Sequence, residues 1–250
     1  QWMNDPIGKA ILDYFITGKA EVILVDNNYT EGEEMDPALF FRTFSEMPPV
    51  EQKALALCEG SVLDIGAGAG SHVLELQSRG FKVTAVEKSE LAAGVMSQRG
   101  VKEVICDDIF RISPGTYQTI LMLMNGSGIA GTLEGLGKLL DHLRGMLDPV
   151  GQILMDSSDI GYLFTEDDGS VWIDLSNENY YGEMIYEVAY GSDRSDKFFW
   201  LFVDFDTLCE IAASRGFSCT KEAEDDNGAY LARLCLVEGG EAPFMERNMD

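Results

Sequence analysis

A glycine-rich stretch in the first half of the chain constrains the fold more than any other feature. Residues 62–70 read VLDIGAGAG, so a short apolar run leads into three glycines at alternate positions. The apolar run is typical of a buried strand, and residues 71–79 after it have the pattern of a helix. Because glycine has no Cβ, a turn built from it lets a ligand approach the backbone closely. We therefore expect a ligand-binding strand–turn–helix unit here.

The same alternation of strands and helices continues to about residue 158. It predicts a parallel sheet with right-handed crossovers and helices on both faces, which is a doubly wound α/β fold. In such sheets, ligands bind at the carboxyl ends of the strands. Further strands are predicted at 82–86, 101–106, 119–124 and 152–156, with a turn at 148–151.

The remaining segments complete one predicted domain, residues 1–250. One helix is expected to start at Asn4 or Asp5, and another from Asp36, interrupted at residues 48–49 and then resumed. Two apolar runs, 183–190 and 197–203, predict a β-hairpin. In chain order, the predicted parts are a helical N-terminal cap (1–60), the cofactor-binding core (61–158), an insertion with the β-hairpin on the substrate side (159–203), and a closing helix with antiparallel strands (204–250).

Acidic residues end three successive predicted strands. Asp64 lies two positions before the first glycine, Glu87 ends the second strand, and Asp107 and Asp108 end the third. A carboxylate at the second strand is suited to accept hydrogen bonds from both hydroxyls of a ribose. One at the third strand can meet an adenine amino group. These acids predict a nucleoside site, and polar strand ends in an acidic protein are the alternative.

The predicted ligand carries no phosphate. Asp64 lies so close to the glycine turn that it disfavours the pyrophosphate of a dinucleotide at the helix N-terminus. Ser71 also stands where the dinucleotide-binding pattern has its last glycine. S-adenosylmethionine instead brings an ammonium and a sulfonium, two cations that nearby acids favour. An NAD-dependent oxidoreductase on a similar sheet is therefore the disfavoured alternative.

Residues 58–158 resemble the class I S-adenosylmethionine-dependent methyltransferases. The resemblance implies a mostly parallel seven-stranded sheet whose last strand is antiparallel. It also implies S-adenosylmethionine as the cofactor and S-adenosylhomocysteine as the product. The motifs that carry the resemblance are residues 62–70, 83–87, 106–109 and 119–126.

The resemblance also implies a role for each motif. The glycine loop would hold the methionine part of the cofactor, and Asp64 would support that loop or the ammonium through water. Glu87 would bind the ribose. Asp108 with Ile109 would frame the adenine, and Asp107 is the rival for that role. The cofactor-binding residues expected in this way are Asp64, Gly66, Ala67, Gly68, Gly70, Glu87, Lys88, Asp107, Asp108, Ile109, Asn125 and Gly126.

Three residues are candidates for catalysis: Asn125, His72 and Tyr29. Asn125 would orient a nucleophile or hold the amino acid part of the cofactor, and an ordinary turn asparagine is the alternative. The family's adenine- and glutamine-methylating members have Pro-Pro-aromatic after this asparagine, whereas Gly-Ser-Gly follows it here, which disfavours that subclass. His72 would be a general base facing the cofactor, or a solvent-facing helix residue. Tyr29 or Arg42 in the cap would touch the cofactor carboxylate or the substrate.

Other aromatic residues are less directly implicated. Tyr14 is a further candidate base or orienting group, and His142 is expected to be structural because it lies between leucines of a long helix. The aromatic residues of the insertion either line an acceptor pocket or pack the insertion onto the core. They are Tyr162, Trp172, Tyr180 and Tyr181.

Eighteen basic and 43 acidic residues give the chain a net charge of −25. Such a surface repels nucleic acids and anionic membranes, so we expect neither as a partner and favour a cationic or neutral small-molecule acceptor. No secretory signal or membrane-spanning run is evident, and five cysteines without a Cys-x-x-Cys pair suit a cytoplasmic protein. Two histidines make a metal site unexpected. We predict methyl transfer to an O, N or C atom, with a non-catalytic cofactor-binding module as the alternative.

Overall fold

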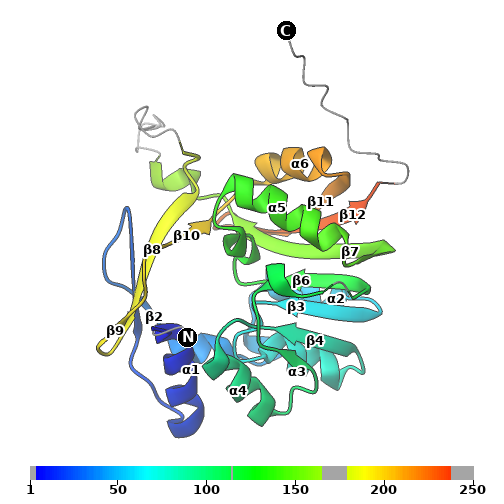
Figure 1. Ribbon diagram of the computed structural model, residues 1–250. Helices are drawn as coiled ribbons and strands as arrows, with labels where there is room; N and C mark the ends of the chain where they lie inside the picture. Colours follow the sequence, from blue (N-terminus) through cyan, green and yellow to red (C-terminus); the bar gives the residue numbers. More distant parts are fainter. Residues whose placement is uncertain (1–3, 114, 165–178, 238–250) are drawn as a thin grey trace.

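Two β-sheets organise the chain in the computed structural model, which describes residues 4–113, 115–164 and 179–237 (Figure 1). Within these residues, a seven-stranded sheet forms the core and a smaller antiparallel sheet lies beside it. The smaller sheet, called here the second sheet, has the order β10-β8-β1-β2, with β9 paired to β8. Its strands are β1 (Ile23–Asn27), β2 (Glu33–Met35), β8 (Glu183–Tyr190), β9 (Asp193–Arg194) and β10 (Phe198–Leu201).

The core sheet confirms the predicted doubly wound α/β fold. Its strand order is β11-β12-β7-β6-β3-β4-β5, and the strands from β7 to β5 in this order are parallel. Strand β12 runs antiparallel to both of its neighbours. The strands are β3 (Ser61–Ile65), β4 (Lys82–Val86), β5 (Val104–Ile105), β6 (Tyr117–Met122), β7 (Leu147–Ser158), β11 (Phe217–Glu224) and β12 (Ala229–Leu236).

Helices cover both faces of the core sheet because its central strands are apolar on both sides. Leu63 packs with Leu136 on one face, whereas Val62 packs with Val73 on the other. The first face is covered by α5 (Leu133–Arg144) and α6 (Phe205–Ser214). The second face is covered by α2 (Pro49–Leu57), α3 (Ser71–Ser78) and α4 (Glu90–Arg99).

Strand β6 lies two residues earlier than predicted, and two other core strands differ more from their predicted bounds. The strand predicted at 101–106 is only the two-residue β5, because Val101 N–H bonds to Met96 O and completes the end of α4. The turn predicted at 148–151 lies inside β7 as an irregularity. There the register with β6 moves from the pair Tyr117–Leu147 to Thr119–Gln152, and Val150 N–H donates to the Asp148 side chain.

The N-terminal segment contains the predicted first helix, α1 (Pro6–Thr17), which Asp5 caps by accepting the Gly8 N–H at 2.8 Å. The prediction of a helix from Asp36 is wrong. Two short 3₁₀ turns replace it, η1 (Pro37–Phe41) and η2 (Phe44–Glu46), because Arg42 between them has extended backbone. The α-helix begins only at α2.

The second sheet joins the N-terminal segment to residues 183–201. The predicted hairpin is present as β8 and β10, and β1 pairs along β8 with Leu24 opposite Ala189. This pairing between the N-terminal segment and the insertion was not predicted. Helix α1 lies between the second sheet and α4, since Ala10 packs with Val188 and Ile11 packs with Val95. In the described residues, no helix is both long and apolar enough to cross a membrane.

Candidate functional site

The glycine loop follows β3 at the carboxyl edge of the core sheet. Gly66 and Ala67 donate their N–H groups to Val86 O at 2.9 and 3.2 Å, which fixes the loop to the end of β4. Gly66, Gly68 and Gly70 have φ values of 75°, 55° and 84°, a left-handed conformation that favours glycine. The loop is therefore preorganised by backbone bonds, as expected for residues that meet a ligand through their main chain.

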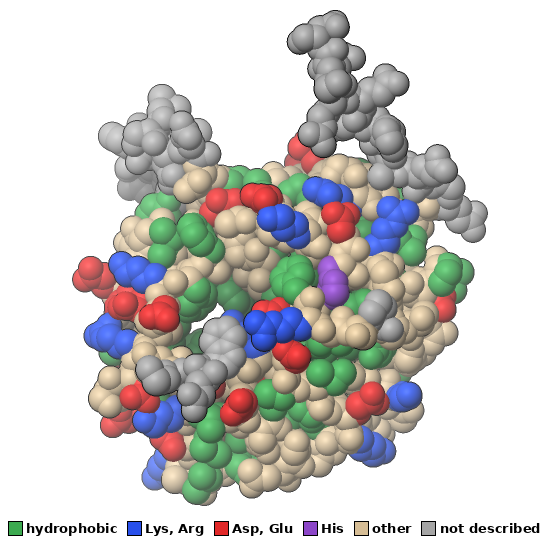
Figure 2. Space-filling model, in the orientation of Figure 1, with side chains coloured by type: hydrophobic (Ala, Val, Ile, Leu, Met, Phe, Trp, Pro, Cys, Tyr) green, Lys and Arg blue, Asp and Glu red, His purple; other side chains and the backbone are tan. Residues whose placement is uncertain are grey.

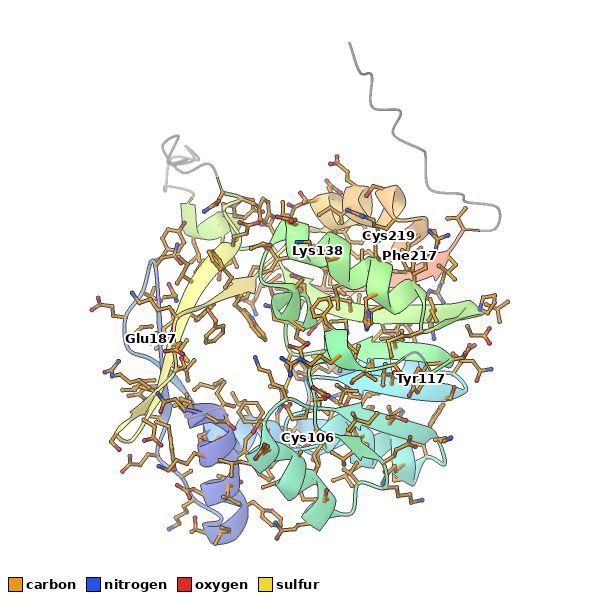
Figure 3. The ribbon with its side chains drawn as sticks, viewed as in Figure 1. Cys106, Tyr117, Lys138, Glu187, Phe217 and Cys219 are labelled. Carbon is orange, nitrogen blue, oxygen red and sulfur yellow. The ribbon has the colours of Figure 1, made fainter. Side chains whose placement is uncertain are left out.

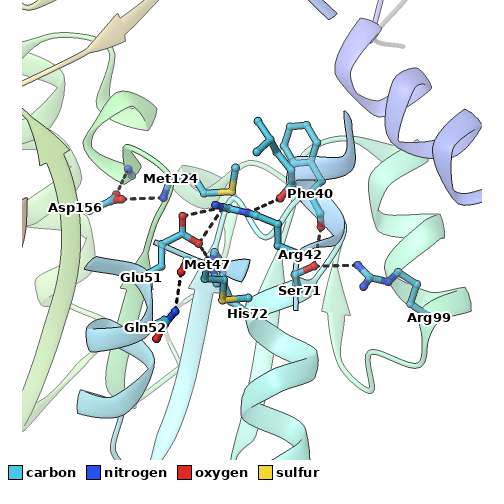
Figure 4. A network of polar contacts seen from close by, with 12 residues as sticks. Phe40, Arg42, Met47, Glu51, Gln52, Ser71, His72, Arg99, Met124 and Asp156 are labelled. Carbon is cyan, nitrogen blue, oxygen red and sulfur yellow. Dashed lines mark hydrogen bonds and ion pairs between the residues drawn. The ribbon is translucent and has the colours of Figure 1, made fainter. Parts of the chain in front are cut away.

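Neighbouring segments lie directly against this loop. A Cβ on Gly66 would be 2.9 Å from Ile129 Cδ1, and a Cβ on Gly68 would be 3.2 Å from Phe40 Cδ1. Arg99 donates to Ala69 O at 2.6 Å, with its guanidinium close to Ser71 (Figure 4). The N-terminal segment and the turn after β6 thus both border the loop.

Glu87 connects the glycine loop to the start of α4. Its Oε2 accepts the Gly68 N–H and its Oε1 accepts the Ser89 N–H, each at 2.9 Å. Burial raises the pKa of this carboxyl, although the two backbone donors act in the opposite direction. Each oxygen accepts one of these backbone bonds and keeps a further lone pair, so the carboxylate can still accept ligand hydroxyls.

Asp64 is a buried carboxylate with one oxygen that no hydrogen bond satisfies. The residue is 2% exposed, and its Oδ2 has no hydrogen-bond partner in the described structure. Burial raises its pKa to about 6, and His72 opposes this effect. An unpaired buried carboxylate is costly, so this position fits the cationic group of a ligand.

Arg42, Glu51 and His72 form a polar triad (Figure 4), and the charges of His72 and Glu51 act on the pKa of Asp64. Glu51 on α2 accepts from Arg42 at 2.8 and 3.0 Å, and its Oε2 is 2.8 Å from His72 Nε2. His72 is 7% exposed, so the alternative of a solvent-facing residue is wrong. Its Nε2 is engaged by Glu51. Its role as a general base stays a prediction.

The turn after β6 carries Asn125, the first catalytic candidate. Its Nδ2 donates to Leu201 O at 3.1 Å, and its Oδ1 accepts from Ser127 at 3.4 Å and Ser157 at 3.3 Å. The Asn125 amide therefore fastens the core to β10 of the second sheet. This geometry suits a positioning role better than a proton transfer.

The residues that were predicted to bind adenine form a short turn after β5. Asp107 Oδ1 accepts the Asp108 N–H, and Asp108 caps η3 (Ile109–Arg111) by accepting the Phe110 N–H. Ile109 is 4% exposed and packs in the core, and its carbonyl oxygen lies 2.8 Å from His142 Nε2. His142 thus has the structural position that was predicted.

The other predicted residues are spread over several parts of the fold. Tyr29 is 46% exposed in the turn between β1 and β2, and Lys88 is exposed. Tyr180 donates to Asp204 at the start of α6, while Tyr162 is 63% exposed. Tyr181 donates to Asp159, Tyr14 packs on Phe41, and Trp172 lies outside the described residues. No group of three or more potential metal ligands occurs in the described part of the chain.

Sequence reasoning missed two buried acids of this region, Glu51 and Asp156. Asp156 is 8% exposed near the end of β7 and accepts backbone N–H groups from the turn after β6. The sequence did contain a signal for Asp156: this acid follows the apolar run 153–155, just as Asp64 follows Val62 and Leu63. Glu51 gave no such signal, because its partners come from other segments.

Comparison with solved structures identifies the family. A S-adenosylmethionine-dependent methyltransferase from Bacteroides fragilis, crystallised with S-adenosyl-L-homocysteine, is 40% identical with a TM-score of 0.89. The match covers 95% of this chain and 97% of that one. No protein-family model and no curated protein matches the chain.

More distant structures share the fold alone. The CcbJ methyltransferase from Streptomyces caelestis is 14% identical, with a TM-score of 0.59 over 78% of this chain and 99% of that one. The sugar N-methyltransferase KedS8 from a Streptoalloteichus species is also 14% identical, with a TM-score of 0.52 over 82% and 94%. With its glycine loop, its acidic strand ends and 40% identity to a family member, the chain belongs to the S-adenosylmethionine-dependent methyltransferases.

Proposed function

We propose that this methyltransferase acts on a small-molecule acceptor and methylates an O, N or C atom by in-line displacement. Cofactor binding is supported by one observation: the buried Oδ2 of Asp64 has no hydrogen-bond partner in the described structure, and it fits a cationic ligand group. The glycine loop would hold the amino acid part, Glu87 the ribose, and Asp107 or Asp108 the adenine. When bound, the cofactor supplies an activated methyl group on a positively charged sulfur. The protein's residues align the reactants and exclude water.

The acceptor is proposed to bind between the second sheet and the turn after β6. Figure 2 shows the surface hollowed between these parts, and side chains of the second sheet point toward that space in Figure 3. Trp200 packs on the turn, since a Cβ on Gly128 would lie 2.0 Å from its Cε2. Tyr186 and Phe198 share its face of the sheet, with ring centroids 6.3 Å apart.

The chemistry of this face supports a small acceptor that is neutral or cationic. The Tyr186 hydroxyl and Trp200 Nε1 add two hydrogen-bonding groups to this aromatic face, and such groups can serve a ligand. Glu33 lies near enough to Tyr186 that its charge adds to burial in raising the pKa of that phenol to about 12. Aromatic rings with a nearby carboxylate favour cations.

Calorimetry and methyl incorporation test this function together. We expect S-adenosylhomocysteine to bind with micromolar affinity and NAD to give no heat. We also expect labelled methyl from S-adenosylmethionine to enter small molecules of an ultrafiltered metabolite extract. In a parallel reaction with the unfiltered extract, label in the protein or nucleic acid fraction would contradict the small-molecule acceptor. Cofactor binding without incorporation in any fraction would favour the non-catalytic binding module.

The substitution Glu87→Gln should weaken S-adenosylhomocysteine binding by roughly 10- to 100-fold, or about 1.5–3 kcal/mol. An amide has one acceptor oxygen, whereas the carboxylate already serves Gly68 and Ser89 with its two. The measurement is a calorimetric Kd, with the exposed Glu90→Gln as the matched control of unchanged affinity. An unaltered Kd in Glu87→Gln would remove the ribose assignment.

A further inference from the structure

The turn after β6 is strained. Met124 and Asn125 have φ values of 64° and 57°, and in the described chain they are the non-glycine residues with positive φ. The left-handed conformation is costly for a residue with a Cβ, and asparagine is among the residues that tolerate it best. Such strain persists only where surrounding structure enforces it, and it concentrates at functional sites.

Asp156 is the residue that enforces this conformation. Its Oδ2 accepts the Met124 N–H at 3.1 Å and its Oδ1 accepts the Gly126 N–H at 2.7 Å (Figure 4). One buried carboxylate therefore bridges the two backbone donors on either side of Asn125. Hydrogen bonds to a buried charge are stronger than neutral ones, which suits them to hold a strained turn.

The strained turn lies next to the glycine loop. Strand β6 pairs with β3, whereas Glu87 and Asp107 follow β4 and β5 on the other side of β3. Ile129, just beyond the turn, would be 2.9 Å from a Cβ on Gly66. A nucleoside along this edge with its ribose at Glu87 would direct its 5′ substituent toward the loop and this turn.

We propose that Asp156 is a positioning residue that holds residues 124–126 in the conformation that receives the amino acid end of the cofactor. This inference rests on the cofactor placement given under the proposed function. Asp156 acts through the turn and not by touching the ligand. Because Asn125 also binds Leu201 O, the same carboxylate fixes the point where the second sheet attaches to the core.

Two ligands that differ only in the amino acid end test this role. Asp156→Asn keeps the side-chain shape but turns an NH2 group toward one of the two backbone donors. We expect its affinity for S-adenosylhomocysteine to fall at least tenfold and its affinity for adenosine to change less than about twofold, measured by calorimetry. The surface variant Asp141→Asn is the control, with both affinities unchanged. Equal losses for the two ligands, or no loss, would overturn the proposal.

A glycine at position 124 provides the rescue. Glycine adopts the φ of Met124 without penalty, so Asp156→Asn should cost less than about threefold in S-adenosylhomocysteine affinity when made in a Met124→Gly background. An undiminished loss in that background would show that Asp156 does not act through the turn.

If Asp156→Asn does not fold, hydrogen exchange in the unmodified protein tests whether the Asp156 hydrogen bonds hold the turn. The Met124 and Gly126 amides should be protected without ligand, and fast exchange of both would overturn the proposal. Failure of the unmodified protein to bind S-adenosylhomocysteine would instead contradict the proposed cofactor placement.

Discussion

Asp64→Asn is expected to make the ligand-free protein more stable at pH 8, by ~1–2 kcal/mol, while weakening S-adenosylhomocysteine binding at least ~30-fold. The carboxylate is 2% exposed with an unpartnered Oδ2, so its ionisation is costly until a cation arrives. Asparagine removes that cost and also removes the charge that is proposed to favour the ammonium of the ligand. The two effects have opposite signs because, under this proposal, the charge stabilises the bound ligand and destabilises the ligand-free fold.

The stability difference should depend on pH in a defined direction. Burial raises the pKa of Asp64 from 3.8 to about 6, so the folded protein holds this proton more tightly than the unfolded chain. Wild-type stability therefore falls relative to the variant as the pH rises from about 4 to about 6. The advantage of Asp64→Asn should be small near pH 4 and complete above pH 6.

Urea denaturation at several pH values and calorimetry with S-adenosylhomocysteine measure the two effects. The control Asp141→Asn breaks only the surface pair Asp141–Arg215, so it should lower stability by less than about 1 kcal/mol and leave the ligand affinity unchanged. A variant that loses stability at pH 8 and keeps its ligand affinity would contradict this account of Asp64.

Glu51→Gln is expected to destabilise the fold by about 3–5 kcal/mol near pH 6, the largest stability effect predicted here. The Glu51 side chain is 6% exposed and pairs with both Arg42 and His72. Its loss leaves the partly buried Arg42 and the buried His72 without their shared anion. The triad joins the N-terminal segment, α2 and α3, so its disruption should loosen the base of the glycine loop.

The pH dependence of this effect follows from two opposite pKa shifts. Burial alone would raise the pKa of Glu51, but His72 and Arg42 outweigh it, so the pKa lies below its ordinary 4.5. Burial alone would lower the pKa of His72, but Glu51, Asp64 and Asp156 outweigh it, so the pKa lies above 6.5.

Both partners are therefore charged between pH 4.5 and 6.5, where the effect of Glu51→Gln should be greatest. The destabilisation should shrink as the pH rises through the raised pKa of His72, because His72 then loses its charge. Part of it should remain, because Arg42 stays charged. The control is Glu75→Gln, which breaks the surface pair Glu75–Arg79 and should cost less than about 1 kcal/mol. Equal urea midpoints for the two variants at pH 6 would contradict a stabilising triad.

The elements of the core sheet could be predicted from the sequence because each is specified by residues that are adjacent in the chain. The apolar run and glycines of residues 62–70 specify a strand and a tight loop, and Glu87 follows its strand in the same way. The helix from Asp36 failed because the tertiary pair Arg42–Glu51 holds Arg42 in extended backbone. Helical propensity was overridden there by a contact that propensity does not describe.

The parts that sequence reasoning missed depend on contacts between distant segments. The hydrogen bond from the Met124 N–H to Asp156 joins residues 32 positions apart in the sequence. The bond between the Asn125 amide and Leu201 O joins residues 76 positions apart. The burial of His72 follows from Glu51 on another helix. The roles of the predicted site residues, the single-domain organisation and the cytoplasmic location stay predictions.

The pairing of β1 with β8 has a consequence for how the chain folds as it is synthesised. Asn28 and Ile185, which hydrogen-bond across this pairing, are 157 residues apart, so β1 emerges from the ribosome long before its partner. Until then β1 exposes an open edge, a hazard for aggregation. Its hairpin partner β2 carries the adjacent charges Glu33 and Glu34, and such charges discourage wrong pairing along an edge. The second sheet can therefore pair only after β8 has been synthesised, and the core sheet is completed later still, because β11 and β12 follow in the chain.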